Sequence, residues 1–453
     1  MNRIVLIGNG FDLAHGLPTG YHHFLNNYWQ EWYERLCTCV DCKLSDEFYE
    51  FAMKYNDRLA IDLSLKHAIY LLNMHLMQHR SLEQMAANEP LYSAKSFNDL
   101  IQLCDLVNLY REEQDFPERI HYKSTSQLFT AINNACKAKW VDIENEYYRL
   151  LKQVSEPNVF IYGVNAEILN TDLSNIKDKL TNYLNEIQAD RITVDIYNEN
   201  IKKIIFEPFN LQDISNGGTE LFLDNIGFEV SELPGGMCQG EIEDEMKAHP
   251  EYSFMNTEDD AYRAMIEDKY IKGQLKGFDL PNKILLLNFN YTNTAEKLYA
   301  ESENDTDCES IYIHGKLNDP NNPVIFGYGD EMDEHYKEIV NLNNNDYLQN
   351  IKSIRYLETD NYRNLLSFID SEPYQIYIMG HSCGNSDRTL LNTLFEHENC
   401  VSIKPFYYID KDSKDNYIDI IQNISRNFKD ATLMRDRVVN KGYCEPLPQN
   451  IIE

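Results

Sequence analysis

The sequence predicts an α/β protein with a mostly parallel sheet and a large, mainly helical insertion. Three observations favour this fold. A short apolar run, Ile4–Ile7, leads directly into Gly8-Asn9-Gly10, as a buried strand does when it ends in a tight turn. Further short apolar runs ending in polar, glycine-bearing turns cluster after residue 280. The stretch between them mostly has apolar residues at helical spacing.

The first turn has features of a nucleotide-binding loop. Gly8 and Gly10 let the backbone turn sharply and approach a ligand closely. A helix that begins near Phe11 would point its free N–H groups at an anion. The next glycine is Gly16, whereas the dinucleotide fingerprint places its third glycine three residues after the second. Both a nucleotide loop and a plain strand-to-helix turn fit this spacing.

Apolar runs near the end of the chain predict the remaining strands. They are Lys283–Leu287, Ser310–Ile313, Val324–Phe326, Tyr374–Met379 and Ile403–Ile409. The carboxyl ends of parallel strands lie at one edge of a sheet, and ligands bind in the crevice there. We therefore expect a Rossmann-like sheet domain formed by residues 1–25 and 280–453.

Residues 26–279 form the expected insertion. Apolar periodicity predicts a helix over Gln127–Gln153, and Val159–Tyr162 is a candidate strand. Asn216-Gly-Gly218 predicts a loop. Asp142 and Glu146 lie one helical turn apart, which suits a metal-binding or acid–base pair, although a solvated face is commoner in an acidic protein.

Composition limits the partners and the compartment. The 73 acidic and 41 basic residues give a net charge of −32, which disfavours direct binding to nucleic acid or an anionic membrane. No apolar run approaches the roughly 20 residues of a membrane span, and no signal peptide is recognisable. We expect a cytoplasmic protein with reduced cysteines. Cys37, Cys39 and Cys42 are close together, but structural zinc needs four ligands and no partner pair follows, so no metal is expected.

Polar residues at the expected strand ends form one candidate site. His314 is its strongest proton-transfer candidate, because it follows a strand directly and precedes Gly315. With an ordinary pKa of about 6.5, it could accept a hydroxyl proton at cellular pH. A structural histidine is the alternative. The full set is Asn9, Asp12, Asn288, Asn290, His314, Ser382 and Asp387.

Gly380-His-Ser-Cys-Gly384 also fits the nucleophile elbow of serine hydrolases, with Ser382 as the nucleophile. That mechanism needs an acid and then a histidine after the serine. His397 is the histidine that follows, and it lies near the far end of the next expected helix. The hydrolase is therefore the less favoured interpretation.

Several motifs together resemble the AbiH family of bacterial phage-abortive-infection proteins. They also look like the sirtuin-like NAD-hydrolysing domains of antiphage defence. The motifs are Ile7-Gly-Asn-Gly-Phe-Asp-Leu-Ala-His-Gly-Leu-Pro-Thr-Gly-Tyr21, Asn288-Phe-Asn-Tyr-Thr292, Ile313-His-Gly315 and Gly380-His-Ser-Cys-Gly-Asn-Ser-Asp387, with a looser match around Trp140–Glu144.

This resemblance implies a sirtuin-like sheet and an antiphage enzyme that hydrolyses the nicotinamide–ribose bond of NAD⁺. Asn290 and His314 would be catalytic. The remaining matched residues would bind NAD⁺ or a related nucleotide: Gly8, Asn9, Gly10, Asp12, Asn288, Gly380, Ser382 and Asp387. The resemblance leaves open whether a phage-derived molecule triggers the protein and whether the protein forms a homo-oligomer. The rival is a non-catalytic nucleotide sensor that signals through the helical insertion.

Overall fold

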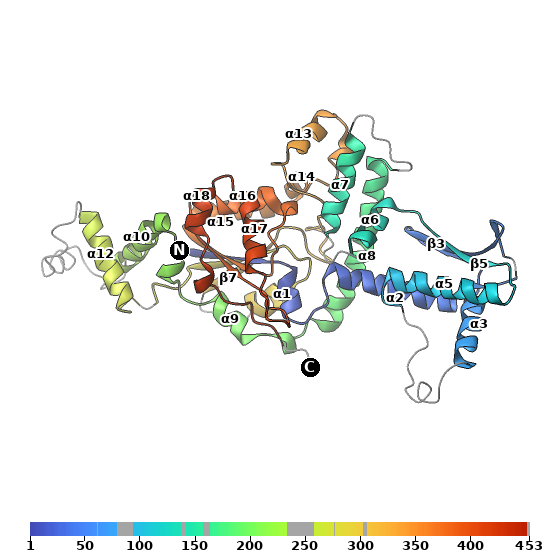
Figure 1. Cartoon of the computed structure of the whole chain (residues 1–453). Helices are drawn as coiled ribbons and strands as arrows, with labels where there is room; N and C mark the ends of the chain where they lie inside the picture. Colours follow the sequence, from blue (N-terminus) through green and yellow to red (C-terminus); the bar gives the residue numbers. More distant parts are fainter. Residues whose placement is uncertain are drawn as a thin grey trace. The chain divides into compact units, whose positions relative to one another are not determined.

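The structure is a computed structural model, and it divides the chain into two compact units (Figure 1). The first unit comprises Met1–Leu17, Leu184–Glu338 and Asn350–Glu453, and the second comprises Pro18–Tyr183 and Ile339–Gln349. Residues 184–279, which the sequence analysis assigned to the insertion, thus belong to the unit that holds the parallel sheet. The described residues are 1–60, 62–78, 94–136, 142–156, 164–232, 258–275, 277–301 and 306–450.

The first unit contains a five-stranded parallel sheet in the order β7-β6-β1-β8-β9. The mixed α/β class predicted from the sequence is thereby confirmed. The strands are β1 (Asn2–Ile7), β6 (Lys283–Asn288), β7 (Asp307–Tyr312), β8 (Tyr374–Met379) and β9 (Cys400–Phe406).

One predicted strand, Val324–Phe326, does not form. Pro323 before it lacks a backbone donor. The amide of Ile325 donates to the carbonyl of His314 at 2.8 Å, so this segment folds back on the turn after β7. Nearby Tyr328 forms an isolated bridge to Ile351, not part of a strand.

Both faces of the parallel sheet are buried, which explains its nearly continuous apolar strands. Alternate residues of β1 point to opposite faces: Ile4 and Leu6 to one, Val5 and Ile7 to the other. Helices α15, α16 and α17 pack on the Ile4 face, while α1 and α9 pack on the Val5 face (Figure 1).

The described part of the first unit also contains α-helices. They are α1 (Asn9–Ala14), α9 (Glu199–Ile205), α10 (Asn216–Glu232), α12 (Glu258–Ile271), α14 (Lys352–Arg355), α15 (Asn361–Ser371), α16 (Arg388–Phe395), α17 (Tyr417–Arg426) and α18 (Ala431–Arg437). Two more, α8 (Ala166–Arg191) and α13 (Glu334–Asn341), run across the division between the units.

The predicted loop at Asn216-Gly-Gly218 is wrong, because α10 begins there. A side chain at Gly218 would lie 2.6 Å from Cβ of Val401 in β9. The glycine is therefore explained by close helix–sheet packing rather than by a turn.

The second unit contains a small antiparallel sheet in addition to helices. The sheet consists of β2 (Lys43–Ser45), β3 (Tyr49–Tyr55), β4 (Arg58–Leu59) and β5 (Arg119–Ser124). The helices are α2 (Tyr21–Thr38), α3 (Leu65–Gln78), α5 (Phe97–Glu113), α6 (Gln127–Cys136) and α7 (Ile143–Ser155). Its core is aromatic, with Phe48 stacked on Phe129 at 4.3 Å between ring centroids.

The single helix predicted over Gln127–Gln153 is wrong, because the structure has two helices there, α6 and α7. The side chain of Asp142 caps α7 by accepting from the amide of Asn145, and Glu146 pairs with Arg149 at 2.8 Å. These two carboxylates thus have separate local partners. The candidate strand Val159–Tyr162 and residues 137–141 lie outside the described residues.

Candidate functional site

The carboxyl ends of neighbouring strands bring most of the predicted site residues to one edge of the parallel sheet. Ile7 at the end of β1 pairs with Asn288 of β6 and with Met379 of β8, and Asn288 pairs in turn with Tyr312 of β7. The polar turns that follow these strands are therefore neighbours, as the sequence predicted.

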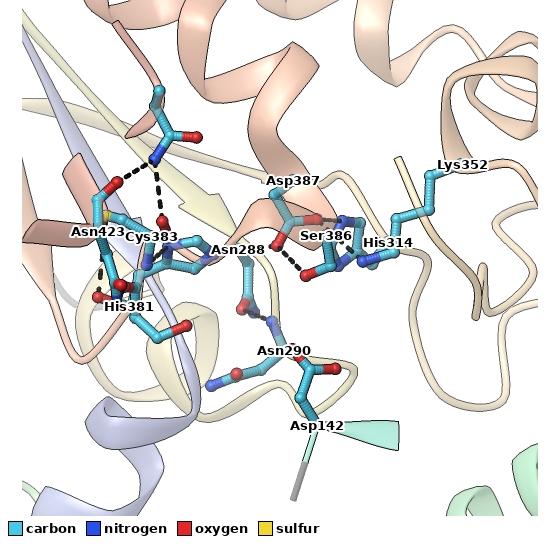
Figure 2. A network of polar contacts seen from close by, with 12 residues as sticks. Asp142, Asn288, Asn290, His314, Lys352, His381, Cys383, Ser386, Asp387 and Asn423 are labelled. Atoms are coloured by element: carbon cyan, nitrogen blue, oxygen red, sulfur yellow. Dashed lines mark hydrogen bonds and ion pairs between the residues drawn. The ribbon is translucent and has the colours of Figure 1, made fainter. Parts of the chain in front are cut away.

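A buried group of charged and imidazole side chains lies at this edge, and Figure 2 shows it from close by. Asp387 is its centre: Oδ1 lies 2.9 Å from Nζ of Lys352 and 3.1 Å from Nε2 of His314. The other oxygen, Oδ2, lies 3.5 Å from Nε2 of His381 and accepts from the Ser386 hydroxyl at 3.4 Å. We call His314, Lys352, His381 and Asp387 the Asp387 cluster.

The cluster combines a neutral histidine with an ionised carboxylate. Burial, reinforced by the charge of Lys352, lowers the pKa of His314 to about 4, so its imidazole is neutral at cellular pH. Burial opposes ionisation of Asp387, but Lys352 and His314 outweigh it and hold the pKa of the carboxyl well below its usual range. The expectation that His314 titrates near 6.5 is therefore wrong.

Hydrogen bonds fix the histidine tautomers. Nδ1 of His381 accepts from the amide of Cys383 at 3.1 Å, so the proton of this ring lies on Nε2, facing Asp387. Nε2 of His314 faces both the ionised Asp387 and the hydroxyl of Tyr356, 3.2 Å away. A neutral His314 then donates through Nε2, which leaves Nδ1 as the nitrogen able to accept a proton.

Phe289 and Tyr356 pack against the imidazoles. The Phe289 ring lies 5.2 Å from that of His314 and 4.1 Å from that of His381, measured between centroids. The Tyr356 ring is parallel to that of His314 at 6.2 Å. These aromatic neighbours supply the low-dielectric surroundings that keep His314 neutral.

The two candidate asparagines have structural partners at the ends of β6 and β1. Oδ1 of Asn288 accepts from the amide of Asn290 at 2.9 Å, and Nδ2 of Asn288 donates to the carbonyl of Thr292. Asn290 is half-buried, and its Nδ2 donates to the carbonyl of Gly8 at 3.0 Å. Asn288 therefore shapes the turn, and that turn holds the Asn290 amide beside the first loop.

The glycines of the first loop pack against the backbone of the turn after β8. A side chain at Gly8 would meet Cα of His381 at 2.4 Å, and one at Gly10 would meet Cα of Gly380 at 2.8 Å. The amide of Gly10 donates to the carbonyl of Gly380 at 2.9 Å. The bare Cα atoms thus serve the contact between two loops.

Two other candidate residues of the first motif, Asn9 and Asp12, lie on α1. Asp12 is buried, and its Oδ2 accepts from the hydroxyl of Thr292 at 2.6 Å, which ties α1 to the turn after β6. Asn9 is exposed at the start of α1. Asp12 therefore has a clear structural role.

The geometry around Ser382 does not match a catalytic triad. Ser382 is exposed after β8, and the residue with a left-handed backbone is its neighbour Cys383, at φ 53°. His397 pairs with Asp370 at 3.1 Å and packs against Tyr374, the first residue of β8. Ser382 and His397 thus lie at opposite ends of a strand that spans about 20 Å.

The part of the chain that the structure describes holds no group of three or more His, Cys, Asp or Glu side chains that could bind a metal ion. Cys37, Cys39 and Cys42 are unpaired thiols at the end of α2 and after it. Within the same residues, no helix is both long and apolar enough to cross a membrane.

The sequence analysis missed Lys352 and Tyr356 as members of this site. Lys352 lies 35 positions before Asp387, and no motif marks it. It is also 1% exposed, which is unusual for a lysine unless a charge partner is buried with it. His381 had a visible signal, because it lies within the Gly380–Asp387 motif.

The comparisons with known proteins identify the family. No curated protein and no solved structure was found to match the chain. A family model described as bacteriophage abortive infection AbiH matches residues 4–409, which include both the parallel sheet and the Asp387 cluster. This chain therefore belongs to the AbiH family, whose description points to a role in abortive infection by phage.

Proposed function

We propose that this protein binds NAD⁺ and hydrolyses its nicotinamide–ribose bond as part of phage defence. One observation carries the proposal: a neutral histidine, held by an ionised carboxylate, lies at the carboxyl edge of the sheet where Asn290 also lies. Histidine–carboxylate pairs in such surroundings are typical of enzyme sites, since burial and charge partners tune their proton affinity.

The strand order supports a Rossmann-like, nucleotide-binding sheet. Numbered along the chain, the order is 3-2-1-4-5, which corresponds to the first five strands of the doubly wound dinucleotide-binding arrangement. In such sheets the ligand lies where the strand order reverses, which here is between β1 and β8. The sirtuin-like resemblance of the motifs adds to this argument.

The proposed reaction breaks the C–N bond to nicotinamide and forms a C–O bond to water, giving ADP-ribose, nicotinamide and one proton. The ribose develops oxocarbenium character as nicotinamide leaves. Asn290 would position the water, and Nδ1 of His314 would accept a hydrogen bond from a ribose hydroxyl. A pKa of about 4 makes His314 a neutral acceptor at cellular pH but a weak base, so orientation counts for more than basicity.

The packing of the loops limits the proposed roles of the other motif residues. Gly8, Gly10 and Gly380 are occupied by contacts with one another, and both oxygens of Asp387 have protein partners. We therefore propose that Asp387 orients His314, and that these three glycines keep the strand ends in register. Ser382 is exposed and suits a peripheral hydrogen bond to substrate.

The same packing favours a second candidate, a nucleotide sensor without turnover. Every side chain of the Asp387 cluster has an internal partner, as expected for a structural core of polar groups. Such a protein would bind NAD⁺ or a related nucleotide and would change conformation rather than cleave it.

Chromatographic measurement of NAD⁺ incubated with pure protein tests both candidates. We expect turnover by the wild type and a loss of about 10²–10⁴-fold in His314→Gln, the usual cost of removing a positioned acid–base group. His397→Gln is the matched control, because His397 also pairs with a carboxylate but lies at the other end of β8.

The outcomes separate the interpretations. Binding by calorimetry without turnover would favour the sensor, and absence of both would exclude either nucleotide function. Labelling of Ser382 by a fluorophosphonate would instead revive the serine hydrolase. Matching thermal melts of wild type and variants are needed before a loss of turnover counts as a catalytic effect.

A further inference from the structure

The antiparallel sheet of the second unit gathers positive charge that is scattered along the sequence. In an antiparallel pair, directly opposite residues share a face. On one face the register brings together Lys43 of β2, Lys54 of β3, and Arg119, His121 and Lys123 of β5. We call these five residues the lysine face.

The lysine face surrounds one small residue and one carboxylate. Ala52 lies between Lys43 and His121 across the strands, and Glu50 lies opposite Lys123. Nζ of Lys43 lies 2.6 Å and Nζ of Lys123 3.8 Å from the Glu50 carboxylate. Hydrogen bonding to Lys43, with the charges of Lys123 and Lys54, lowers the pKa of Glu50.

Positive charge remains in excess after that pairing. In the described residues, Glu50 is the carboxylate that pairs with Lys43 and Lys123, and one carboxylate cannot balance several cations. The side chains of Lys43 and Lys123 are 43% and 61% exposed. Each ammonium has three donors, so these side chains keep donors for an anionic partner.

One cross-strand pair works against folding. Lys54 and Arg119 are directly opposite each other on this face, and like charges in that position destabilise a sheet. The Arg119 guanidinium is held by the carbonyls of Phe116 and Glu118, which fixes its charge at the start of β5. A face used only for folding gains nothing from this repulsion.

We propose that the lysine face binds the phosphate backbone of a nucleic acid. Cations on one strand face recur about every 7 Å, and neighbouring strands lie about 5 Å apart, so several phosphates can be met at once. The proposal goes beyond the proposed NAD⁺ chemistry and involves the other unit. It also revises the expectation, based on net charge, of no direct nucleic-acid binding. At physiological salt, charges more than about 8 Å away are largely screened, so the nearby lysines affect a bound phosphate more than the net negative charge of the chain does.

Fluorescence anisotropy of the full chain with a labelled DNA oligonucleotide, single-stranded or duplex, tests the proposal. For three phosphate contacts on duplex DNA, the logarithm of the affinity should fall with the logarithm of the salt concentration with a slope of about 2.7. The affinity then falls about 40-fold between 50 and 200 mM salt. The variant Lys43→Gln/Lys54→Gln/Lys123→Gln should bind about tenfold or more weakly at low salt. Its affinity should also depend much less on the salt concentration. The comparison of the two DNA forms shows which one the face prefers.

A charge-matched control uses exposed lysines of the first unit. Lys411→Gln/Lys414→Gln/Lys429→Gln changes the net charge equally and should leave binding unchanged. Lys43→Arg/Lys54→Arg/Lys123→Arg should retain binding, which separates loss of charge from loss of folding.

Three results would overturn the proposal: no binding by the wild type at low salt, an equal loss in the control, or equal binding by the Gln variant. Light scattering supplies one more decisive outcome. If the Gln variant changes the oligomeric state and leaves DNA binding intact, the face meets the acidic surface of a second copy instead.

Discussion

Asp387 in the first unit and Glu50 in the second are both carboxylates surrounded by cationic or imidazole groups, but the lysines beside them differ in exposure. Asp387 and Lys352 are buried, with side chains 9% and 1% exposed, whereas Lys43 and Lys123 beside Glu50 are largely exposed. Both carboxyl groups have a lowered pKa. The charges of the Asp387 cluster are buried, so they must be paired within the protein. The exposed cations of the lysine face are solvated by water and can bind an anionic partner.

The largest difference should appear when one lysine is removed from each group. Lys352→Met leaves the Asp387 carboxylate buried without its cation, which typically costs about 3–5 kcal/mol of unfolding free energy. Lys43→Met breaks a pair whose lysine is 43% exposed, and Lys123 stays near Glu50, so the change should cost at most about 1 kcal/mol. Urea unfolding at pH 7 measures both, and equal costs would show that burial does not distinguish the two groups.

A smaller effect is expected from acidification. The pKa of His314 lies at about 4 in the folded protein, below its ordinary 6.5. The unfolded chain therefore binds the proton first, and stability is lost as the pH falls from 6.5 towards 4. Between pH 7 and pH 5 the loss from His314 is about 2 kcal/mol.

His314→Gln should remove this share of the pH dependence. The share of His15 should remain, because burial lowers its pKa to about 4 as well. An NMR titration gives the site-specific check: the pKa of His314 should rise in Lys352→Met, since the lysine charge helps to lower it. An unchanged titration would mean that Lys352 does not set the protonation state of the cluster.

Much of the first unit could be predicted because its signals are local. Apolar runs ending at polar turns identified β1, β6, β7, β8 and β9, and the carboxyl ends of parallel strands lie at one edge. The prediction of a strand at Val324–Phe326 was wrong although the segment is apolar. Pro323 lacks a backbone donor, and the amide of Ile325 donates to the carbonyl of His314 instead of to a neighbouring strand.

The site was harder to predict, since its chemistry depends on tertiary neighbours. His314 and Asp387 were identified from motifs, but the pairing of Asp387 with Lys352 arises only from the fold. Gly8 and Gly10 were assigned to ligand approach, whereas their Cα atoms face Gly380 and His381, a distinction that spacing does not encode. The lysine face was missed because its members come from three separate strands.

The smallest effect on stability belongs to Glu50→Gln, and it tests the lysine face most directly. Glu50 pairs with exposed lysines, so its loss should change the unfolding free energy by less than about 1 kcal/mol. The same change removes the carboxylate that competes with phosphate for Lys43 and Lys123. DNA affinity at low salt should therefore rise a few-fold, with a salt slope at least as steep as in the wild type. Weaker binding after this substitution would mean that Glu50 orders the lysines for their partner, and unchanged binding would place the contact elsewhere.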